Sequence, residues 1–217
     1  MPGRLVLASA SPRRSSLLTQ AGVEFEVLPI NVPEDLGEFE DPIDACGQLA
    51  RRKALARAAT LTGEALVIGA DTVVAIEEPG GTGGATSWRL LGKPRDENHA
   101  AEMLASLSGT RHLVVTGVCV ASAPGHAATV EVERTWVHMR TITDEEVAAY
   151  VASGEWRGKA GGYAIQETAD RFVEALEEGG FDNVVGLPVE RTLALLRAAG
   201  WAPGLPADPA NPVDRAD

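Results

Sequence analysis

The spacing of apolar and polar residues along this chain alternates between a period typical of strands and one typical of helices. Short apolar runs bounded by glycine, proline, asparagine or aspartate predict strands. These runs lie at residues 4–8, 25–28, 65–76, 88–91, 113–121, 130–139, 171–176 and 183–185. Apolar residues at helical spacing predict helices at residues 11–22, 41–58, 96–107, 143–153 and 188–199. Interleaved strands and helices predict an α/β fold, in which helices pack on a mixed twisted sheet.

Capping residues mark the predicted start of three of these helices. Ser11 is suited to cap a helix whose first turn holds Pro12, and Asp41 precedes Pro42 in the same way. The segment from Thr143 to Glu146 has the spacing of a capping box. Each of these helices therefore has a local start signal.

Two glycine-rich segments predict loops. Residues 79–87 read as the turn of a hairpin, and residues 158–166 read as a loop that enters a strand. The sequence shows no internal repeat and no clean linker, so we expect residues 1–200 to form a single domain. Residues 201–217 contain four prolines, and we expect a largely disordered tail there.

Composition restricts the class of partner. Of the 217 residues 45% are hydrophobic but only 5% are aromatic, which predicts a mainly aliphatic core. The formal net charge of −12 argues against nonspecific binding to a nucleic acid polymer or an anionic membrane, because the long-range field repels both. A compact phosphate ligand needs only a local cluster of cations and N–H groups, and net charge does not report on such a cluster.

Cysteines, histidines and hydropathy favour a soluble cytoplasmic protein. Cys46 and Cys119 lie far apart in apolar or helical surroundings, so we expect two reduced, buried thiols. The four histidines show no spacing typical of metal ligands: His99, His112, His126 and His138. We find no pattern of a secretory leader and no apolar run long enough to span a bilayer.

The segment from Ser9 to Arg14 is a candidate phosphate-binding turn. It places the hydroxyls of Ser9 and Ser11 and the guanidiniums of Arg13 and Arg14 around a predicted strand-to-helix turn. Helix N-termini and arginines both bind phosphate oxygens. The Gly-x-x-x-x-Gly-Lys-Ser/Thr pattern of P-loop proteins does not occur. The alternative is an ordinary helix cap followed by two solvated arginines.

Asp71 is the strongest candidate for a catalytic group. It interrupts the apolar run of residues 65–76, where an unpaired charge would be costly to bury. In a triphosphate site, this carboxylate can accept a proton from attacking water or hold a divalent metal. The alternative is an ion pair with a lysine or arginine. Glu34, in a loop after a predicted strand, is a weaker candidate metal ligand.

Three lysines and one glutamine complete the set of candidate site residues. Lys53 lies on a helix with a basic cluster, Lys93 lies in a Gly-Lys-Pro turn, and Lys159 precedes two glycines that allow close approach of a ligand. Gln166 can read a base edge, because an amide offers both a donor and an acceptor. Each of these residues alone is more typical of a solvated surface.

Taken together, the motifs resemble the Maf family of nucleotide pyrophosphatases, in the branch that acts on dTTP and UTP. The similar segments are Ser9 to Arg14, Ala50 to Lys53, Gly69 to Val73, Gly92 to Arg95, Leu107 to Gly109, Lys159 to Gln166 and Val185 to Pro188. The resemblance covers Leu5 to about Leu196. It implies a fold related to inosine triphosphate pyrophosphatases, with two lobes around a central cleft.

The resemblance also implies an activity. A triphosphate would be hydrolysed to the monophosphate and pyrophosphate with a divalent cation, Mg²⁺ or Mn²⁺. Asp71 would be the general base, and Arg13, Thr72 and Gln166 would help to select the base. The family resemblance allows a homodimer, and it implies links to arrest of cell division and to the removal of modified nucleotides.

Two segments depart from the family pattern. Residues 167–170 replace a stretch that is usually rich in glycine, which affects the shape of the base pocket. Residues 79–87 form a longer turn than expected, which lengthens a surface hairpin at little entropic cost. Two other functions stay open: a nucleotide sensor without significant turnover, and a pyrophosphatase for a purine or modified nucleotide.

Overall fold

A computed structural model describes residues 3–79, 87–125 and 127–202. The strands are β1 (Leu5–Leu7), β2 (Glu26–Val27), β3 (Ala65–Glu78), β4 (Ser87–Leu91), β5 (Arg111–Ala123), β6 (Ala128–Met139) and β7 (Val173–Glu177). The helices are α1 (Pro12–Gln20), α2 (Pro42–Ala58), α3 (Glu97–Leu107), α4 (Asp144–Ser153), α5 (Phe181–Val185) and α6 (Val189–Ala198). Short 3₁₀ turns lie at Leu36–Glu38, Ala160–Gly162 and Thr168–Phe172.

The strands form one mixed sheet in the order β2-β1-β3-β5-β6-β7, with β4 also paired to β3. β1 runs parallel to β2 and β3, whereas the pairs β3–β4, β3–β5, β5–β6 and β6–β7 are antiparallel. Since β5 occupies one edge of β3, β1 and β4 share the other edge. The predicted α/β fold with a mixed sheet is confirmed.

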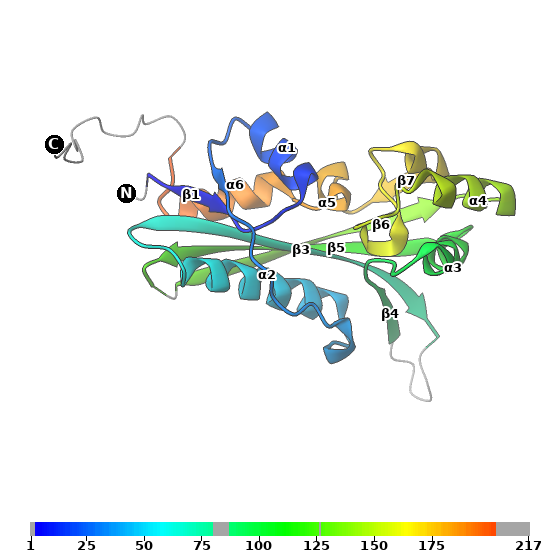
Figure 1. The fold of residues 1–217 in the computed structure, drawn as a ribbon, viewed down its shortest axis with the longest axis horizontal. Helices are drawn as coiled ribbons and strands as arrows, with labels where there is room; N and C mark the ends of the chain where they lie inside the picture. Colours follow the sequence, from blue (N-terminus) through cyan, green and yellow to red (C-terminus); the bar gives the residue numbers. More distant parts are fainter. Residues whose placement is uncertain (1–2, 80–86, 126, 203–217) are drawn as a thin grey trace.

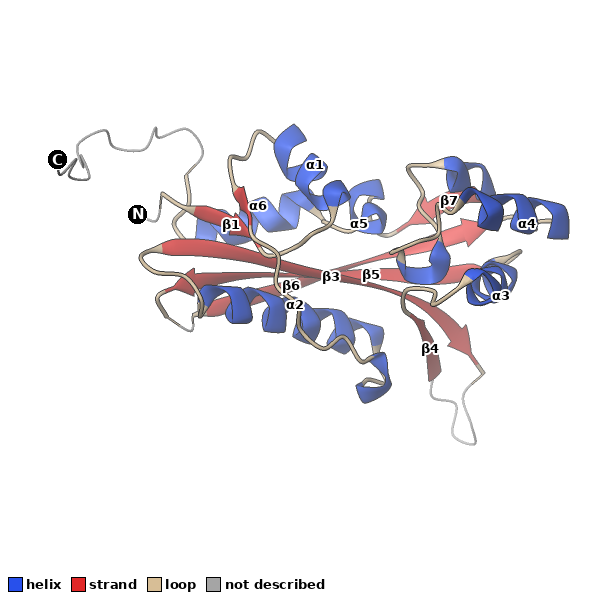
Figure 2. Ribbon diagram, in the orientation of Figure 1, coloured by secondary structure: helices blue, strands red, loops and turns tan. Residues whose placement is uncertain are grey.

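Helices cover both faces of the sheet (Figures 1 and 2). The long helix α2 lies on one face, and α1, α5 and α6 lie on the other, while α3 and α4 gather at the end near β7. The buried side chains between these layers are mostly aliphatic, as the composition predicts. None of the helices in the described ranges is long and apolar enough to cross a membrane.

Two glycines bring α2 unusually close to the sheet. A Cβ atom at Gly69 of β3 would overlap the main-chain oxygen of Ala50 and nitrogen of Ala54. A Cβ atom at Gly117, in β5, would overlap the main chain of Cys46. Gly69 and Gly117 therefore allow the α2 backbone to rest directly on the strands.

Three local predictions have mixed outcomes. Asp41 caps α2 by accepting from the N–H groups of Ile43 and Asp44, and Thr143 forms the predicted capping box. Ser11 occupies the N-cap position of α1, but its side chain makes no capping hydrogen bond, so that prediction is wrong. The Ser11 N–H instead donates to Oγ of Ser9, at 3.2 Å.

The predicted strand at residues 183–185 is also wrong, because this segment ends α5. Phe181, Val184 and Val185 have helical i, i+3, i+4 spacing, but a run this short does not distinguish a strand from a helix by period alone. The loop at residues 158–166 does not enter a strand directly. It continues through a 3₁₀ turn, and β7 begins only at Val173.

Some predictions lie outside the described residues. Most of the predicted tail, residues 203–217, and the centre of the predicted hairpin turn, residues 80–86, belong to this group. Both cysteines are buried and unpaired, as predicted. Burial raises the pKa of the Cys119 thiol to about 11, so this group stays protonated near neutral pH.

Candidate active site

The candidate site lies where one edge of β3 changes partner. β1 pairs with β3 as far as Ile68, and β4 pairs with it only from Val74 onward. Asp71 and Thr72 lie between these two points. A cleft of about 1100 Å³ opens there. The gap between β1 and β4 therefore exposes the centre of an otherwise covered strand.

All eleven candidate residues predicted from the sequence line this cleft. They are Ser9, Ser11, Arg13, Arg14, Glu34, Lys53, Asp71, Thr72, Lys93, Lys159 and Gln166. Cationic side chains predominate in the lining over the carboxylates of Glu34, Asp35 and Asp71. The cations are Arg13, Arg14, Lys53, Arg89, Lys93, Arg95, Arg157 and Lys159. A strongly acidic chain thus contains a locally positive cleft, which suits a polyanion.

A lysine joins the two carboxylates of the cleft. Lys53 is 6% exposed and Asp71 is 7% exposed, and the Lys53 ammonium forms a short ion pair with Oδ1 of Asp71. The same ammonium lies 2.5 Å from Oε1 of Glu34. Lys93 donates to Oε2 of Glu34 at 2.9 Å. The ion pair that the sequence left open as the alternative for Asp71 is therefore present in the structure. The ion-paired carboxylate lies in a cleft rather than in a closed core.

The same contacts affect the ionisation of Glu34. Partial burial favours its neutral form, but hydrogen bonds from Lys53 and Lys93 outweigh this effect and lower the pKa of Glu34 to about 2. Glu34 therefore stays charged over the physiological range. Together with Asp71 it presents two carboxylates to a single cation.

Arg14 connects the phosphate-binding turn to the centre of the sheet. Its guanidinium donates to the carbonyl of Gly186 at 2.8 Å, to Oγ of Ser9 at 3.1 Å and to Oγ1 of Thr72 at 3.1 Å. Burial lowers the pKa of Arg14, and the nearby charge of Asp71 partly opposes this. Arg14 thus has most of its donors committed within the chain, whereas Arg13 lines the cleft beside it.

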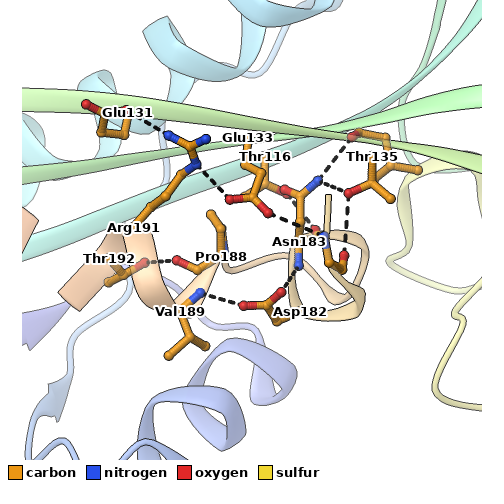
Figure 3. Close-up of polar contacts among 12 residues, drawn as sticks. Thr116, Glu131, Glu133, Thr135, Asp182, Asn183, Pro188, Val189, Arg191 and Thr192 are labelled. Atoms are coloured by element: carbon orange, nitrogen blue, oxygen red, sulfur yellow. Dashed lines mark hydrogen bonds and ion pairs between the residues drawn. The ribbon is translucent and has the colours of Figure 1, made fainter. Parts of the chain in front are cut away.

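Thr72 is hydrogen-bonded to a buried chain of polar groups, and Figure 3 shows the part of it around Thr116, Thr135 and Asn183. Oγ1 of Thr72 is 3.0 Å from Oγ1 of Thr116, its cross-strand neighbour on β5. Thr116 donates to the carbonyl of Asn183 at 2.8 Å. The Asn183 amide donates to the carbonyl of Val114 at 3.2 Å and to Oγ1 of Thr135 at 2.8 Å. The short helix α5, which the sequence did not predict, is thereby fixed against β5 and β6.

The opposite wall of the cleft is held by a second set of contacts. Lys159 is buried and ion-paired to Glu167, a residue that departs from the family pattern. The exposed Gln166 is its neighbour. The N–H of Gly161 donates to the carbonyl of Gly92 at 3.0 Å, which ties the Lys159 loop to the Lys93 loop. The departure at Glu167 therefore has a specific effect, because it supplies a partner for Lys159.

Sequence reasoning missed several residues that line the cleft: Arg89, Arg95, His99, Arg157 and Tyr163. The Tyr163 hydroxyl lies 2.7 Å from Nε2 of the buried His112. Burial lowers the pKa of His112 to about 3, so this histidine is a neutral structural group. Arg95 and Arg157 could have been found from the sequence, because each lies two positions from a predicted site lysine, Lys93 or Lys159.

The carboxylates fit a divalent cation. Glu34 and Asp71 converge on one ammonium, so they lie close enough to share one ion. Two carboxylates supplemented by phosphate oxygens and water form a donor set that Mg²⁺ accepts. Within the part of the chain that the structure describes, no group of three or more His, Cys, Asp or Glu residues has the arrangement of a metal site. Ligands beyond these two carboxylates would therefore come from substrate and solvent.

Comparisons with known proteins agree on one family. The sequence model of the Maf-like protein family matches residues 4–199. A dTTP/UTP pyrophosphatase from Pelotomaculum thermopropionicum is 43% identical over 197 residues, which cover 91% of this chain and 97% of that protein. Proteins with the same name from Anaeromyxobacter sp. and Geobacillus sp. are 45% and 42% identical, over 95% and 91% of this chain and 97% and 99% of their own.

Among solved structures, one similar chain is a nucleoside-triphosphatase / dITP/XTP pyrophosphatase from Mycobacterium abscessus. It is 18% identical, with a TM-score of 0.37, over 63% of this chain and 72% of that chain. At this score the predicted relation to inosine triphosphate pyrophosphatases stays a prediction.

Proposed function

Because the chain belongs to the Maf-like protein family, we propose that it is a pyrophosphatase that hydrolyses dTTP and UTP to the monophosphate and pyrophosphate. The observation that carries this proposal is the position of Asp71. A buried carboxylate lies in a cleft whose lining is mainly cationic. A simple anion-binding site gains nothing from such a group, whereas a hydrolase needs a proton acceptor there.

The triphosphate binds along the turn from Ser9 to Arg14. Oγ of Ser9 already accepts hydrogen bonds from the Ser11 N–H and from Arg14, so its own proton is available to a phosphate oxygen. Lys93 is half-exposed at the cleft and supplies positive charge. Ser9 and Lys93 thus bind oxygens of the substrate by donors and charge, without a P-loop.

Asp71 accepts the proton of the attacking water. The water oxygen forms a bond to the α-phosphorus while the bond from that phosphorus to the bridging oxygen breaks. Pyrophosphate leaves with the bonding electrons, and the proton moves to the carboxylate of Asp71. Lys53 holds that carboxylate in place through its ion pair. Most of the rate enhancement then comes from positioning and electrostatics.

We further propose that Glu34 and Asp71 hold a divalent cation, Mg²⁺ or Mn²⁺. Such an ion supplies Lewis-acid stabilisation to phosphate oxygens when it is bound. A cytoplasmic location, a homodimer and a role in limiting modified nucleotides or in cell division arrest are proposals of the same kind. They follow from the family resemblance.

The test is an assay of pyrophosphate release from a panel of triphosphates, with Mg²⁺ or Mn²⁺ present and with chelator. We expect dTTP and UTP to be the best substrates and chelator to abolish release. Tight binding of nucleotides without release of pyrophosphate would identify a sensor instead. A purine nucleotide as the best substrate would keep the reaction and reject the proposed selectivity.

A further inference from the structure

The hydroxyl protons behind Thr72 have only one consistent arrangement. A carbonyl oxygen only accepts hydrogen bonds, so the 2.8 Å contact between Thr116 and the Asn183 carbonyl commits the single Thr116 proton to that carbonyl. Oγ1 of Thr116 then acts as the acceptor in its 3.0 Å contact with Thr72. The Thr72 proton is therefore directed toward Thr116, away from the cleft.

This arrangement leaves Thr72 with acceptor capacity only. One lone pair of its hydroxyl oxygen accepts from Nη2 of Arg14, at 3.1 Å, and the other remains. Thr72 is only partly buried and lines the cleft. Ser9 has the opposite character, because its lone pairs are used and its proton remains. Thr72 therefore suits a ligand group that donates, and it does not suit a phosphate oxygen.

The anchor of this arrangement is rigid. Thr116, Thr135 and Asn183 are each fully buried. The Asn183 side chain is held by the Val114 carbonyl and by Thr135, so the main-chain carbonyl of Asn183 has little freedom to leave Thr116 (Figure 3). Buried networks of this kind fix the direction of their hydrogen bonds.

We infer that Thr116 is a positioning residue that determines which base the cleft accepts, although it does not line the cleft. By accepting the hydrogen bond of the Thr72 hydroxyl, Thr116 leaves Thr72 as an acceptor for the imide N3–H that uracil and thymine share. Cytosine presents an unprotonated N3 acceptor at the same place, so two acceptors would face each other. The inference rests on the proposed function, which supplies dTTP and UTP as substrates, and it adds that the base lies at the Thr72 end of the cleft.

The test compares kcat/KM for UTP and CTP in variants of the full-length protein. Thr116→Val removes the hydroxyl at nearly constant volume and frees the Thr72 proton. We expect the ratio of UTP to CTP kcat/KM to fall about tenfold, the effect of one neutral hydrogen bond. Thr116→Ser restores the hydroxyl and should restore the ratio. If the valine variant does not fold, Thr116→Ala removes the same hydrogen-bond acceptor.

Thr192→Val is the matched control. Thr192 of α6 is an equally buried threonine, and its hydroxyl donates to the carbonyl of Pro188 at 2.8 Å, outside the network of Thr72, Thr116 and Asn183. It should lower stability and leave the UTP to CTP ratio unchanged. Equal losses on UTP and CTP in the Thr116→Val variant would overturn the inference, as would a parent that turns over CTP as well as UTP. Failure of the parent to release pyrophosphate from UTP and dTTP would instead reject the proposed function.

Discussion

Asp71 and Thr72 are consecutive residues of β3, yet they belong to two different kinds of environment. The Asp71 side is charged, because Lys53 from α2 and Glu34 from a loop meet its carboxylate. On the Thr72 side, hydrogen bonds link one guanidinium to neutral hydroxyls and carbonyls of α5, β5 and the Gly186 turn. Strand alternation directs the two side chains to opposite faces of the sheet.

The difference shows how one strand can separate two tasks. In the proposed mechanism, the carboxylate of Asp71 acts on the attacking water, and its partners are the charged groups of Lys53 and Glu34. The direction of hydroxyl protons at Thr72 is set by geometry, and these groups do not titrate near neutral pH. Under the proposed mechanism, catalysis and selectivity can therefore be altered independently, although Asp71 and Thr72 are adjacent in sequence.

The largest expected effect is on the charged side. Asp71→Asn keeps the shape of the side chain but removes the proton acceptor, so kcat for dTTP and UTP should fall about 10²- to 10⁴-fold. Pyrophosphate release measures the rate, and circular dichroism checks the fold. The control is Asp144→Asn, an exposed residue at the start of α4 that should leave the rate unchanged. A variant of Asp71 as active as the parent would remove the charged side from the mechanism.

The next effect concerns the support of the charged side by α2. Gly69→Ala places a methyl group against the main chain of Ala50 and Ala54, so the helix must move and take Lys53 with it. We expect a loss of about 1 to 3 kcal/mol in the free energy of unfolding, measured with urea, together with a lower kcat.

Gly47→Ala is the control for this substitution. Gly47 lies on α2 itself, and its Cβ would meet only valine side chains, at 3.5 and 3.6 Å. Alanine should be neutral there or stabilise the helix by up to about 1 kcal/mol. If Gly69→Ala were as well tolerated as Gly47→Ala, close helix packing would not be what places Lys53.

A smaller effect is expected on the Thr72 side. Arg14→Lys keeps the charge but cannot reach Ser9, Thr72 and Gly186 together, so kcat/KM for UTP should fall roughly tenfold, about 1 to 2 kcal/mol. Combining it with Thr72→Val should cost less than the sum of the two single changes, because they share one hydrogen bond. Strict additivity in the double-mutant cycle would show that Arg14 and Thr72 act separately.

The smallest effect is a change in acid stability. The pKa of Glu34 is lowered from 4.5 to about 2 in the folded protein, so its ion pairs stabilise the fold above about pH 4.5. That contribution is lost as the pH falls from about 4.5 toward 2. Because Glu34 is partly solvated, we expect no more than about 1 kcal/mol. The difference in Tm between the parent and Glu34→Gln should therefore narrow over this range, and a constant difference would contradict the assignment.

Much of the site could be predicted because its residues carry local signals. An acid inside a long apolar strand, a Gly-Lys-Pro turn and a serine-arginine turn each stand out in sequence. Their convergence on one cleft is consistent with the family resemblance. Their pairing could not be predicted, because Lys53 meets Asp71 only through the close packing of α2 on Gly69 and Gly117, which no periodicity reveals.

Other features depend on tertiary contacts alone. Nothing in the sequence distinguishes the role of Arg13 from that of Arg14. Only the structure shows that Arg14 donates to the carbonyl of Gly186, 172 positions away. Glu167 was recognisable as a departure, but its pairing with Lys159 was not. Asn183 lies in a run too short to assign, and its helical turn is stabilised by bonds to β5 and β6.

Gly69 and Gly117 also restrict how this protein can evolve. Neither residue lines the cleft, and yet a side chain at either position collides with main-chain atoms, which no exchange of neighbouring side chains can move aside. A lineage that lost one of these glycines would have to regain it or shift a whole helix. The ion pair of Lys53 and Asp71 is therefore inherited only together with two glycines, which face α2 on the opposite side of the strands from Thr72.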